Sequence, residues 1–238
     1  MSDLDTVLRD LVIANRILAR EGVVDTFGHV SVRHPERPDR YLISRSRAPE
    51  LVTVEDLMEF ELDGTPVDAR GRTPYGERFI HSALFEARPE VQSVIHNHSQ
   101  TVIPFSVTNV PLRPLSHVAA PMGHDAPVWD IRDKFGDTDL LVVNMEQGRD
   151  LARAVGKGAV ALMRGHGCVV AGASIRKAVF TAVYLQVNAR LQLDSLRLGE
   201  PTYLSPGEVD LATKRQFSPL ALDRAWEHWR LRAGAEKL

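Results

Sequence analysis

The sequence predicts an α/β fold, and three observations lead to that prediction. Helix-type and strand-type patterns alternate along the 238 residues. Hydrophobic residues make up 44% of the chain and charged residues 25%, which is ordinary for a globular protein. No internal repeat, low-complexity segment or linker interrupts the pattern. The length would allow one domain or two small ones, and we expect a single domain over residues 1–238 because nothing marks a boundary.

Charge and cysteine content argue against several function classes. The formal net charge is −2 with no strongly basic block, so we expect no nucleic-acid partner. The lone Cys168 cannot form an intrachain disulfide and fits a reducing compartment. No apolar run is long enough to span a membrane, and Met1–Asp5 is acidic rather than signal-like. We therefore expect a cytoplasmic protein with no membrane partner.

The first half of the chain predicts a helix, two paired strands and a second helix. Apolar residues from Leu4 to Leu18 recur at helical spacing behind the capping candidates Ser2 and Asp3, and Gly22 is a natural end for that helix. The elements expected next are a strand at Phe27–Arg33, a returning strand at Tyr41–Ser44, a polar basic loop at Ser44–Glu50, a capped turn at Thr53–Asp56, a hairpin at Phe60–Val67 that turns at Asp63 and Gly64, and a helix at Tyr75–Arg88 with Glu77 in its first turn.

The second half predicts further strands and longer helices. After a strand-like run at Val91–Ile95 we expect a short helix at Thr101–Phe105, strand and loop over 108–139, a helix near Leu151–Val155, a buried strand at Ala159–Met163, a tight turn at Arg164–Gly167 and a strand at Cys168–Ala171. Ser174 should cap a long helix that runs through Arg197 and ends at Gly199. A capping box at Ser205–Glu208 opens a helical tail over about 205–233, whose Trp226 and Trp229 should pack on another surface.

Four side chains form a candidate metal site. His96 and His98 follow the strand-like run, and side chains i and i+2 of a strand point to the same face, so the two imidazoles can converge. His166 lies between two glycines, which permit a sharp turn and close approach to a bound group. Glu77 adds a carboxylate as a fourth ligand, or acts as an acid/base beside an open coordination position. This donor set suits Zn²⁺, Mn²⁺ or Fe²⁺ without choosing among them.

Plainer interpretations stand beside this one. Single histidines are more often core or surface residues than ligands, and a glutamate in the first turn of a helix commonly only complements the helix dipole. Cys168 lies in an apolar strand, which indicates an inert core thiol rather than a nucleophile. Among the remaining histidines we retain His117 as a candidate and interpret the others as surface or structural residues, namely His34, His81, His124 and His228.

The order of these motifs resembles the class II aldolase and adducin family. The resemblance rests on Gly28–Ser31, Glu77 heading a helix, His96–His98 and the Gly165–Gly167 turn, and its spacing agrees over a core of roughly residues 4–200. It implies an α/β/α sandwich around a mostly antiparallel central sheet. It also implies one divalent metal per subunit, held by the three histidines, and a homotetramer with its sites at subunit interfaces.

Two departures from the aldolases point to one branch of the family. This chain has His29 where aldolases usually carry asparagine, and Ser44–Arg47 where they carry a small-residue phosphate loop. Arginine forks match planar carboxylates bidentately. The chain more closely resembles 3-hydroxy-2-methylpyridine-4,5-dicarboxylate decarboxylase and the hydroxyphthalate decarboxylases. The resemblance implies a metal-dependent, non-oxidative decarboxylase of an aromatic or heteroaromatic hydroxy-dicarboxylate, with Glu77 as proton donor and with substrate-binding residues at His29, Ser44, Arg45, Arg47 and His117.

Three other activities remain open on the sequence. A sugar-phosphate or sugar-acid aldolase is favoured if Ser44–Arg47 binds phosphate rather than carboxylate. A non-haem iron oxygenase is a second alternative, because relatives that process aromatic acids resemble this fold. An adducin-like interaction module is the third. The presence of all three candidate histidines and Glu77 argues against that module, because a scaffold has no physical need for them.

Overall fold

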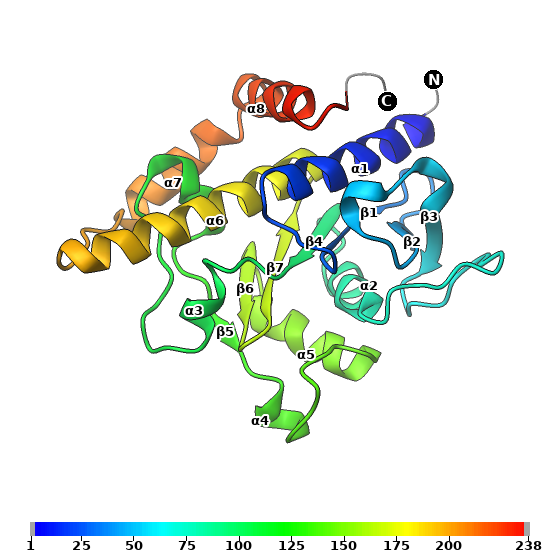
Figure 1. Cartoon of the computed structure of the whole chain (residues 1–238), viewed down its shortest axis with the longest axis horizontal. Helices are drawn as coiled ribbons and strands as arrows, with labels where there is room; N and C mark the ends of the chain where they lie inside the picture. Colours follow the sequence, from blue (N-terminus) through cyan, green and yellow to red (C-terminus); the bar gives the residue numbers. More distant parts are fainter. Residues whose placement is uncertain (1–2, 236–238) are drawn as a thin grey trace.

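Figure 1 shows the computed structural model of the chain, which describes residues 3–235. Within them, seven strands form one sheet in the order β3-β2-β1-β4-β7-β6-β5. The pairs are antiparallel except for β5 and β6, which run parallel. The strands are β1 (His29–Arg33), β2 (Arg40–Ser44), β3 (Leu57–Glu61), β4 (Ser93–Asn97), β5 (Val128–Trp129), β6 (Val160–Met163) and β7 (Gly167–Gly172).

Helices precede, separate and follow these strands. They are α1 (Asp3–Arg20), α2 (Arg78–Ala87), α3 (Ile103–Ser106), α4 (Arg132–Phe135), α5 (Met145–Val155), α6 (Ile175–Leu198), α7 (Pro206–Gln216) and α8 (Pro219–Arg232), with short 3-10 turns η1 (Pro49–Leu51), η2 (Val54–Asp56) and η3 (His117–Met122). Within residues 3–235, no helix combines the length and apolar content needed to cross a bilayer.

Both faces of the sheet are buried under helices (Figure 1). One core joins the sheet to α1, α6 and α8, and a second core joins the opposite face to α2 and α5. The strands alternate between the two cores, so that Ile95 of β4 packs into the first and Val94 into the second. A sheet covered on both faces leaves few strand residues exposed, and every residue of β1 and β4 is buried. The expected α/β/α sandwich with a mostly antiparallel sheet is therefore confirmed.

Strand register brings distant residues to one end of the sheet. His29 of β1 pairs with His96 of β4, and Asn97 at the end of β4 pairs with Cys168 of β7. The turn that leads into β7 therefore lies beside the last residues of β4. A Cβ at Gly167 would overlap the Asn97 carbonyl oxygen, so glycine is required for this approach of the two backbones.

Most expected elements are confirmed within one to three residues, and the capping boxes at Thr53 and Ser205 are present. The expected cap at Ser2 lies outside the described residues. Three details differ. Helix α2 begins at Arg78, which makes Glu77 its N-cap residue rather than a first-turn residue. The returning half of the hairpin that turns at Gly64 is not a full strand: it forms one isolated bridge, Phe60 with Pro66, and backbone hydrogen bonds on either side of it.

The third difference is the 108–139 segment, which contains η3 and α4 and only the two-residue β5. Prolines along this stretch remove backbone donors and favour short, irregular pieces, which leave no periodicity to detect.

The two tryptophans of the C-terminal tail pack within their own chain. Trp226 and Trp229 are only 5% and 6% exposed and pack into the first core of their own chain.

We expect Gly148→Ala to destabilise the fold. Gly148 of α5 packs on α2, where an added Cβ would overlap the Phe79 carbonyl oxygen and lie 3.0 Å from the Ala83 Cβ. Overpacking of this kind costs about 1–3 kcal/mol, which outweighs the gain of about 0.5–1 kcal/mol for replacing glycine in a helix. The midpoint of urea unfolding should fall. Gly207→Ala in α7 is the control, since its Cβ would meet no atom within 4 Å. An unchanged midpoint for Gly148→Ala would contradict this packing.

The native thiol should be unreactive. Cys168 is fully buried, and burial raises its pKa to about 12. Because the thiolate is the reactive form and appears only as the pH approaches that pKa, a thiol reagent at pH 8 should label no cysteine in the folded protein. One thiol per chain should react after unfolding, as the sequence contains one cysteine. Rapid labelling of the folded protein would mean that β7 opens.

Candidate metal centre

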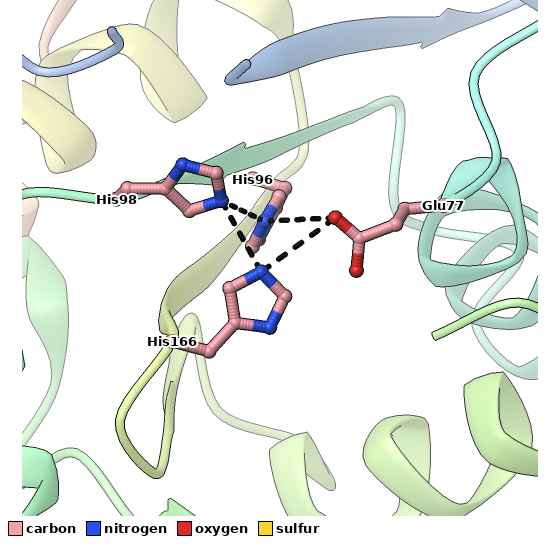
Figure 2. A group of neighbouring side chains, drawn as sticks. All are labelled: Glu77, His96, His98 and His166. Atoms are coloured by element: carbon pink, nitrogen blue, oxygen red, sulfur yellow. Dashed lines mark hydrogen bonds and ion pairs between the residues drawn. The ribbon is translucent and has the colours of Figure 1, made fainter. Parts of the chain in front are cut away.

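Four side chains from separate elements converge at one end of the sheet (Figure 2). His96 belongs to β4, His98 follows it, His166 lies on the turn between β6 and β7, and Glu77 precedes α2. One nitrogen or oxygen from each residue lies within 4.8 Å of the others. The sequence-based grouping of these four residues is therefore reproduced in space.

The ligand atoms are spaced as a small cation would require. The Nε2 atoms of His96 and His98 are 3.0 Å apart, and those of His98 and His166 are 3.2 Å apart. Glu77 Oε2 lies 3.6 Å from the Nε2 atoms of both His96 and His166. Tetrahedral Zn–N bonds would place two nitrogens about 3.3 Å from each other.

Hydrogen bonds behind the rings determine which nitrogens face the centre as acceptors. His96 Nδ1 donates to the Cys168 carbonyl at 3.1 Å, and His166 Nδ1 donates to the Leu140 carbonyl at 3.0 Å. Because a carbonyl oxygen can only accept, each Nδ1 carries the proton and each Nε2 presents a lone pair. His98 Nδ1 faces the Asp25 carboxylate at 3.3 Å in the same manner.

Three imidazole lone pairs therefore face one another without a proton among them. Such an arrangement repels itself unless a cation lies between the nitrogens, and oxygen acceptors behind metal-bound histidines are the usual way of orienting them. The donor set of three imidazoles and one carboxylate fits a divalent transition metal. The four-residue cluster is suitable for such an ion.

Glu77 is held as a carboxylate. Burial opposes its ionisation, but contacts with His166 and His96 and the Val142 N–H outweigh burial and lower the pKa of Glu77 to about 2. Its Oε1 accepts the Val142 N–H at 3.0 Å, which turns Oε2 toward the histidines. Glu77 is thus ready as a ligand or proton acceptor, and it can donate only a proton that it has first taken up.

A pocket of about 700 Å³ opens beside the cluster. Glu77, His98 and His166 lie on one wall, and His29, Arg47 and Tyr75 lie among the other lining residues. His29 packs its ring 4.6 Å from that of Tyr75 and 5.0 Å from that of His96. The pocket therefore joins the candidate metal ligands to a cationic and aromatic surface.

The other predicted substrate residues lie in different places. Ser44 is buried at the end of β2, and Arg45 follows it; among the described residues that line the pocket, neither is present. His117 borders a different cavity, between η3, α6 and α8, together with Tyr184 and Trp229. The structure does not bring His117 to the metal cluster, because η3 packs against α6 and α7.

Two buried residues support the pocket and were not identified as functional from the sequence. Asp56 Oδ1 accepts from Arg45 Nε at 2.6 Å and from Arg47 Nη1 at 3.2 Å, so one carboxylate holds both arginines. Burial opposes the ionisation of Asp56, but Arg45 leads the contacts that lower its pKa. His81 of α2 contacts His29. The sequence signals only a cap at Asp56 and an apolar helix face around His81.

Comparison with known proteins places these features in context. The family described as Class II Aldolase and Adducin N-terminal domain matches residues 9–193. The chain is 34% identical over 244 residues to the decarboxylase tropJ of Talaromyces stipitatus, with 93% of this chain and 92% of that protein covered. It is 30% identical over 236 residues to the 3,4-dihydroxyphthalate decarboxylase of Terrabacter sp., with 93% and 94% covered. The solved L-fuculose 1-phosphate aldolase of Glaciozyma antarctica matches with a TM-score of 0.77 and 25% identity, over 97% of this chain and 89% of that one.

We expect His166→Ala to remove metal from a protein that stays folded. His166 lies on a turn and contributes little to either core, whereas its Nε2 supplies one of the converging lone pairs. Metal affinity should fall about 100-fold or more, beyond the 10- to 100-fold loss typical for residues that only orient a ligand. Elemental analysis and circular dichroism measure the two properties. His124→Ala is the control, because His124 is exposed, pairs with Asp210 and lies outside the four-residue cluster. Full metal occupancy in His166→Ala would refute a three-histidine site.

Proposed function

Since the chain belongs to the class II aldolase and adducin family, we propose that it is a metal-dependent, non-oxidative decarboxylase of an aromatic or heteroaromatic hydroxy-dicarboxylate. It is a lyase, as its family and its named decarboxylase relatives indicate. The observation that carries the finer proposal is the pocket, in which Arg47 and the candidate metal ligands line a common space. Such a space suits an anionic substrate with a second oxygen group for the metal.

The charge distribution supports a carboxylate as the recognised group. Arg47 Nη1 donates a hydrogen bond to Asp56, and the Arg47 side chain, which borders the pocket, is still 33% exposed. A guanidinium presents five N–H donors in a planar fork, which matches a carboxylate. Asp56 fixes that fork before substrate arrives, because Thr53 N–H holds its other oxygen at 2.9 Å.

The chemistry of the site follows from these positions. A divalent metal held by His96, His98 and His166, with Glu77 at hand, would supply Lewis-acid stabilisation of negative charge on the substrate oxygen. Glu77 Oε2 takes the proton of the ring hydroxyl and returns it to the ring carbon that bears the departing carboxylate. The electrons of the broken C–C bond then return to the ring as CO₂ leaves, and the phenolate regains a proton from solvent.

A sugar-phosphate or sugar-acid aldolase is the second candidate. It is favoured by the likeness to L-fuculose 1-phosphate aldolase over nearly the whole chain. Both reactions break a C–C bond and leave its electrons beside a substrate oxygen, and a divalent metal held by the four-residue cluster would stabilise that charge in either case. The wall formed by Arg47 and Tyr75 distinguishes them, because a phosphate cradle works through small residues that expose backbone N–H groups.

A substrate panel tests the proposal directly. Purified protein loaded separately with Mn²⁺, Zn²⁺ or Fe²⁺ is supplied with hydroxyphthalates, hydroxypyridine dicarboxylates and sugar phosphates. We expect CO₂ release from at least one dicarboxylate without oxygen consumption, and the most active ion identifies the metal. Cleavage of a sugar phosphate alone would establish the aldolase, and oxygen uptake would establish an oxygenase.

Arg47→Ala should weaken turnover of dicarboxylates while metal content is preserved. Loss of a charge-assisted contact costs about 1.5–3 kcal/mol, or roughly 10- to 100-fold in kcat/KM. Steady-state kinetics and elemental analysis measure the two effects. Arg70→Ala is a matched control, since Arg70 is 76% exposed and pairs with Asp68 on a separate loop. Wild-type kinetics in Arg47→Ala would mean that this arginine is only a solvated residue.

We also propose that the protein is a homotetramer with its sites at subunit interfaces. Its proposed location is the cytoplasm. Members of this family are commonly oligomeric. Apolar side chains at the pocket mouth support a covering partner, since Phe27 is 68% exposed and Leu141 is 39% exposed. The aromatic tail does not support it, because Trp226 and Trp229 are buried in their own chain.

Sedimentation tests the assembly. The chain has a mass of 26.5 kDa, so a tetramer would sediment at about four times that value. A single-chain particle at micromolar concentration would exclude it.

A further inference from the structure

Three buried side chains, joined by short contacts, lead away from the substrate pocket. His29 Nδ1 lies 2.6 Å from His81 Nε2, and His81 Nδ1 lies 2.6 Å from Ser31 Oγ. His29 is 1% exposed, and the other two residues are fully buried. His29 lines the pocket, whereas His81 and Ser31 lie behind it. The three residues come from β1 and α2, outside the candidate metal ligands.

Hydrogen counting allows only two neutral arrangements of this chain. Both rings are buried, and within residues 3–235 neither forms an ion pair with a carboxylate, so each ring is neutral and carries one N–H. In the first arrangement the Ser31 hydroxyl donates to His81 Nδ1, His81 Nε2–H donates to His29 Nδ1, and His29 carries its proton on Nε2. In the second, every bond is reversed, and His29 Nε2 presents a lone pair.

The position of Ser31 decides between them. Its hydroxyl has an unprotonated imidazole nitrogen at 2.6 Å in the first arrangement, whereas the second leaves it only the Val94 carbonyl at 3.5 Å. Arg33 N donates to the Gln92 carbonyl, and strand alternation two residues along gives the Val94 carbonyl a ladder bond from Ser31 N. The shorter contact therefore favours donation from the hydroxyl to His81, which is the first arrangement.

This arrangement affects the pocket through His29 Nε2, which carries the proton. His29 Nε2 makes no hydrogen bond to any residue within 3–235, while His29 itself lines the pocket. We propose that Ser31 and His81 are positioning residues that hold His29 as a neutral Nε2–H donor for an anionic oxygen of the bound substrate. The identity of that oxygen, a carboxylate, rests on the proposed function. The direction of the donor does not.

This assignment divides the histidines of the pocket into two kinds. His96 and His166 present lone pairs toward the cation site, since their Nδ1 atoms donate to carbonyl oxygens. His29, whose ring lies 5.0 Å from that of His96, presents a proton instead. An anion bound in the pocket would therefore have a hydrogen-bond donor at His29 and the candidate metal ligands nearby. An unprotonated His29 Nε2 would repel the same anion.

Nitrogen NMR on histidine-labelled protein distinguishes the two arrangements of His29 and His81 without substrate. Spectra of the metal-free and Zn²⁺-loaded chain, assigned by the signals lost in His29→Asn and His81→Asn, distinguish protonated from unprotonated ring nitrogens. We expect Nε2 protonated and Nδ1 unprotonated in both residues. Protonation of His29 at Nδ1 in the wild type would overturn the proposal.

Ser31→Ala adds a second readout with a matched control. It should release His29 into a mixture of the two tautomers and raise the Kd of phthalate about 2- to 10-fold, as expected for one neutral hydrogen bond. Ser93→Ala removes an equally buried hydroxyl, which donates to the Ser31 carbonyl at 2.8 Å and contacts neither ring. It should change neither property, and Ser31→Thr should restore both. Wild-type spectra in Ser31→Ala would refute the role of Ser31.

The two proposals can fail separately. If phthalate does not bind the Zn²⁺-loaded wild type while His29 carries its proton on Nε2, the dicarboxylate assignment fails and the donor assignment stands. If phthalate binds and His29 is protonated on Nδ1, the donor assignment fails and the proposed substrate class stands.

Discussion

The convergence of three imidazole lone pairs on one point is the interaction on which the rest of the site depends. Carbonyl oxygens of Cys168 and Leu140 accept hydrogen bonds from His96 Nδ1 and His166 Nδ1 at the rear of each ring. Those carbonyls belong to a neighbouring strand and to the loop after α4, so the backbone itself enforces the repulsion at the centre. A bound cation would offset this repulsion, and metal affinity would then depend on the integrity of the sheet.

The sheet supplies the rigidity that this arrangement demands. Strand β4 lies in the middle of the sheet with β1 and β7 as antiparallel neighbours, and helices bury both of its faces. The pairing of His29 with His96 across β1 and β4 then joins the donor side of the pocket to the metal side. A change in register by one residue would move these side chains to opposite faces, so register and chemistry are specified together.

Local spacing explains why part of the site could be predicted from the sequence. Two histidines one residue apart on a strand must share a face, and a histidine between glycines marks a tight turn, so His96, His98 and His166 could be singled out. Asp56 and His81 could not, because their partners are determined by folding. Asp56 meets Arg47 across a turn, and His81 reaches His29 from 52 residues away through the packing of α2 on the sheet. His117 was assigned to the substrate without a spacing argument, and it borders another cavity.

The close approach at Gly167 means that two parts of the site differ in which substitutions they can accept. Because its Cα abuts the Asn97 backbone, no side chain fits where the two ligand-bearing segments meet. A side chain at that junction would force the two backbones apart, whereas Arg47 is held from a different part of the fold, by Asp56 beside β3. The substrate range could therefore change through substitutions in the Arg47 loop while the candidate metal centre keeps its geometry.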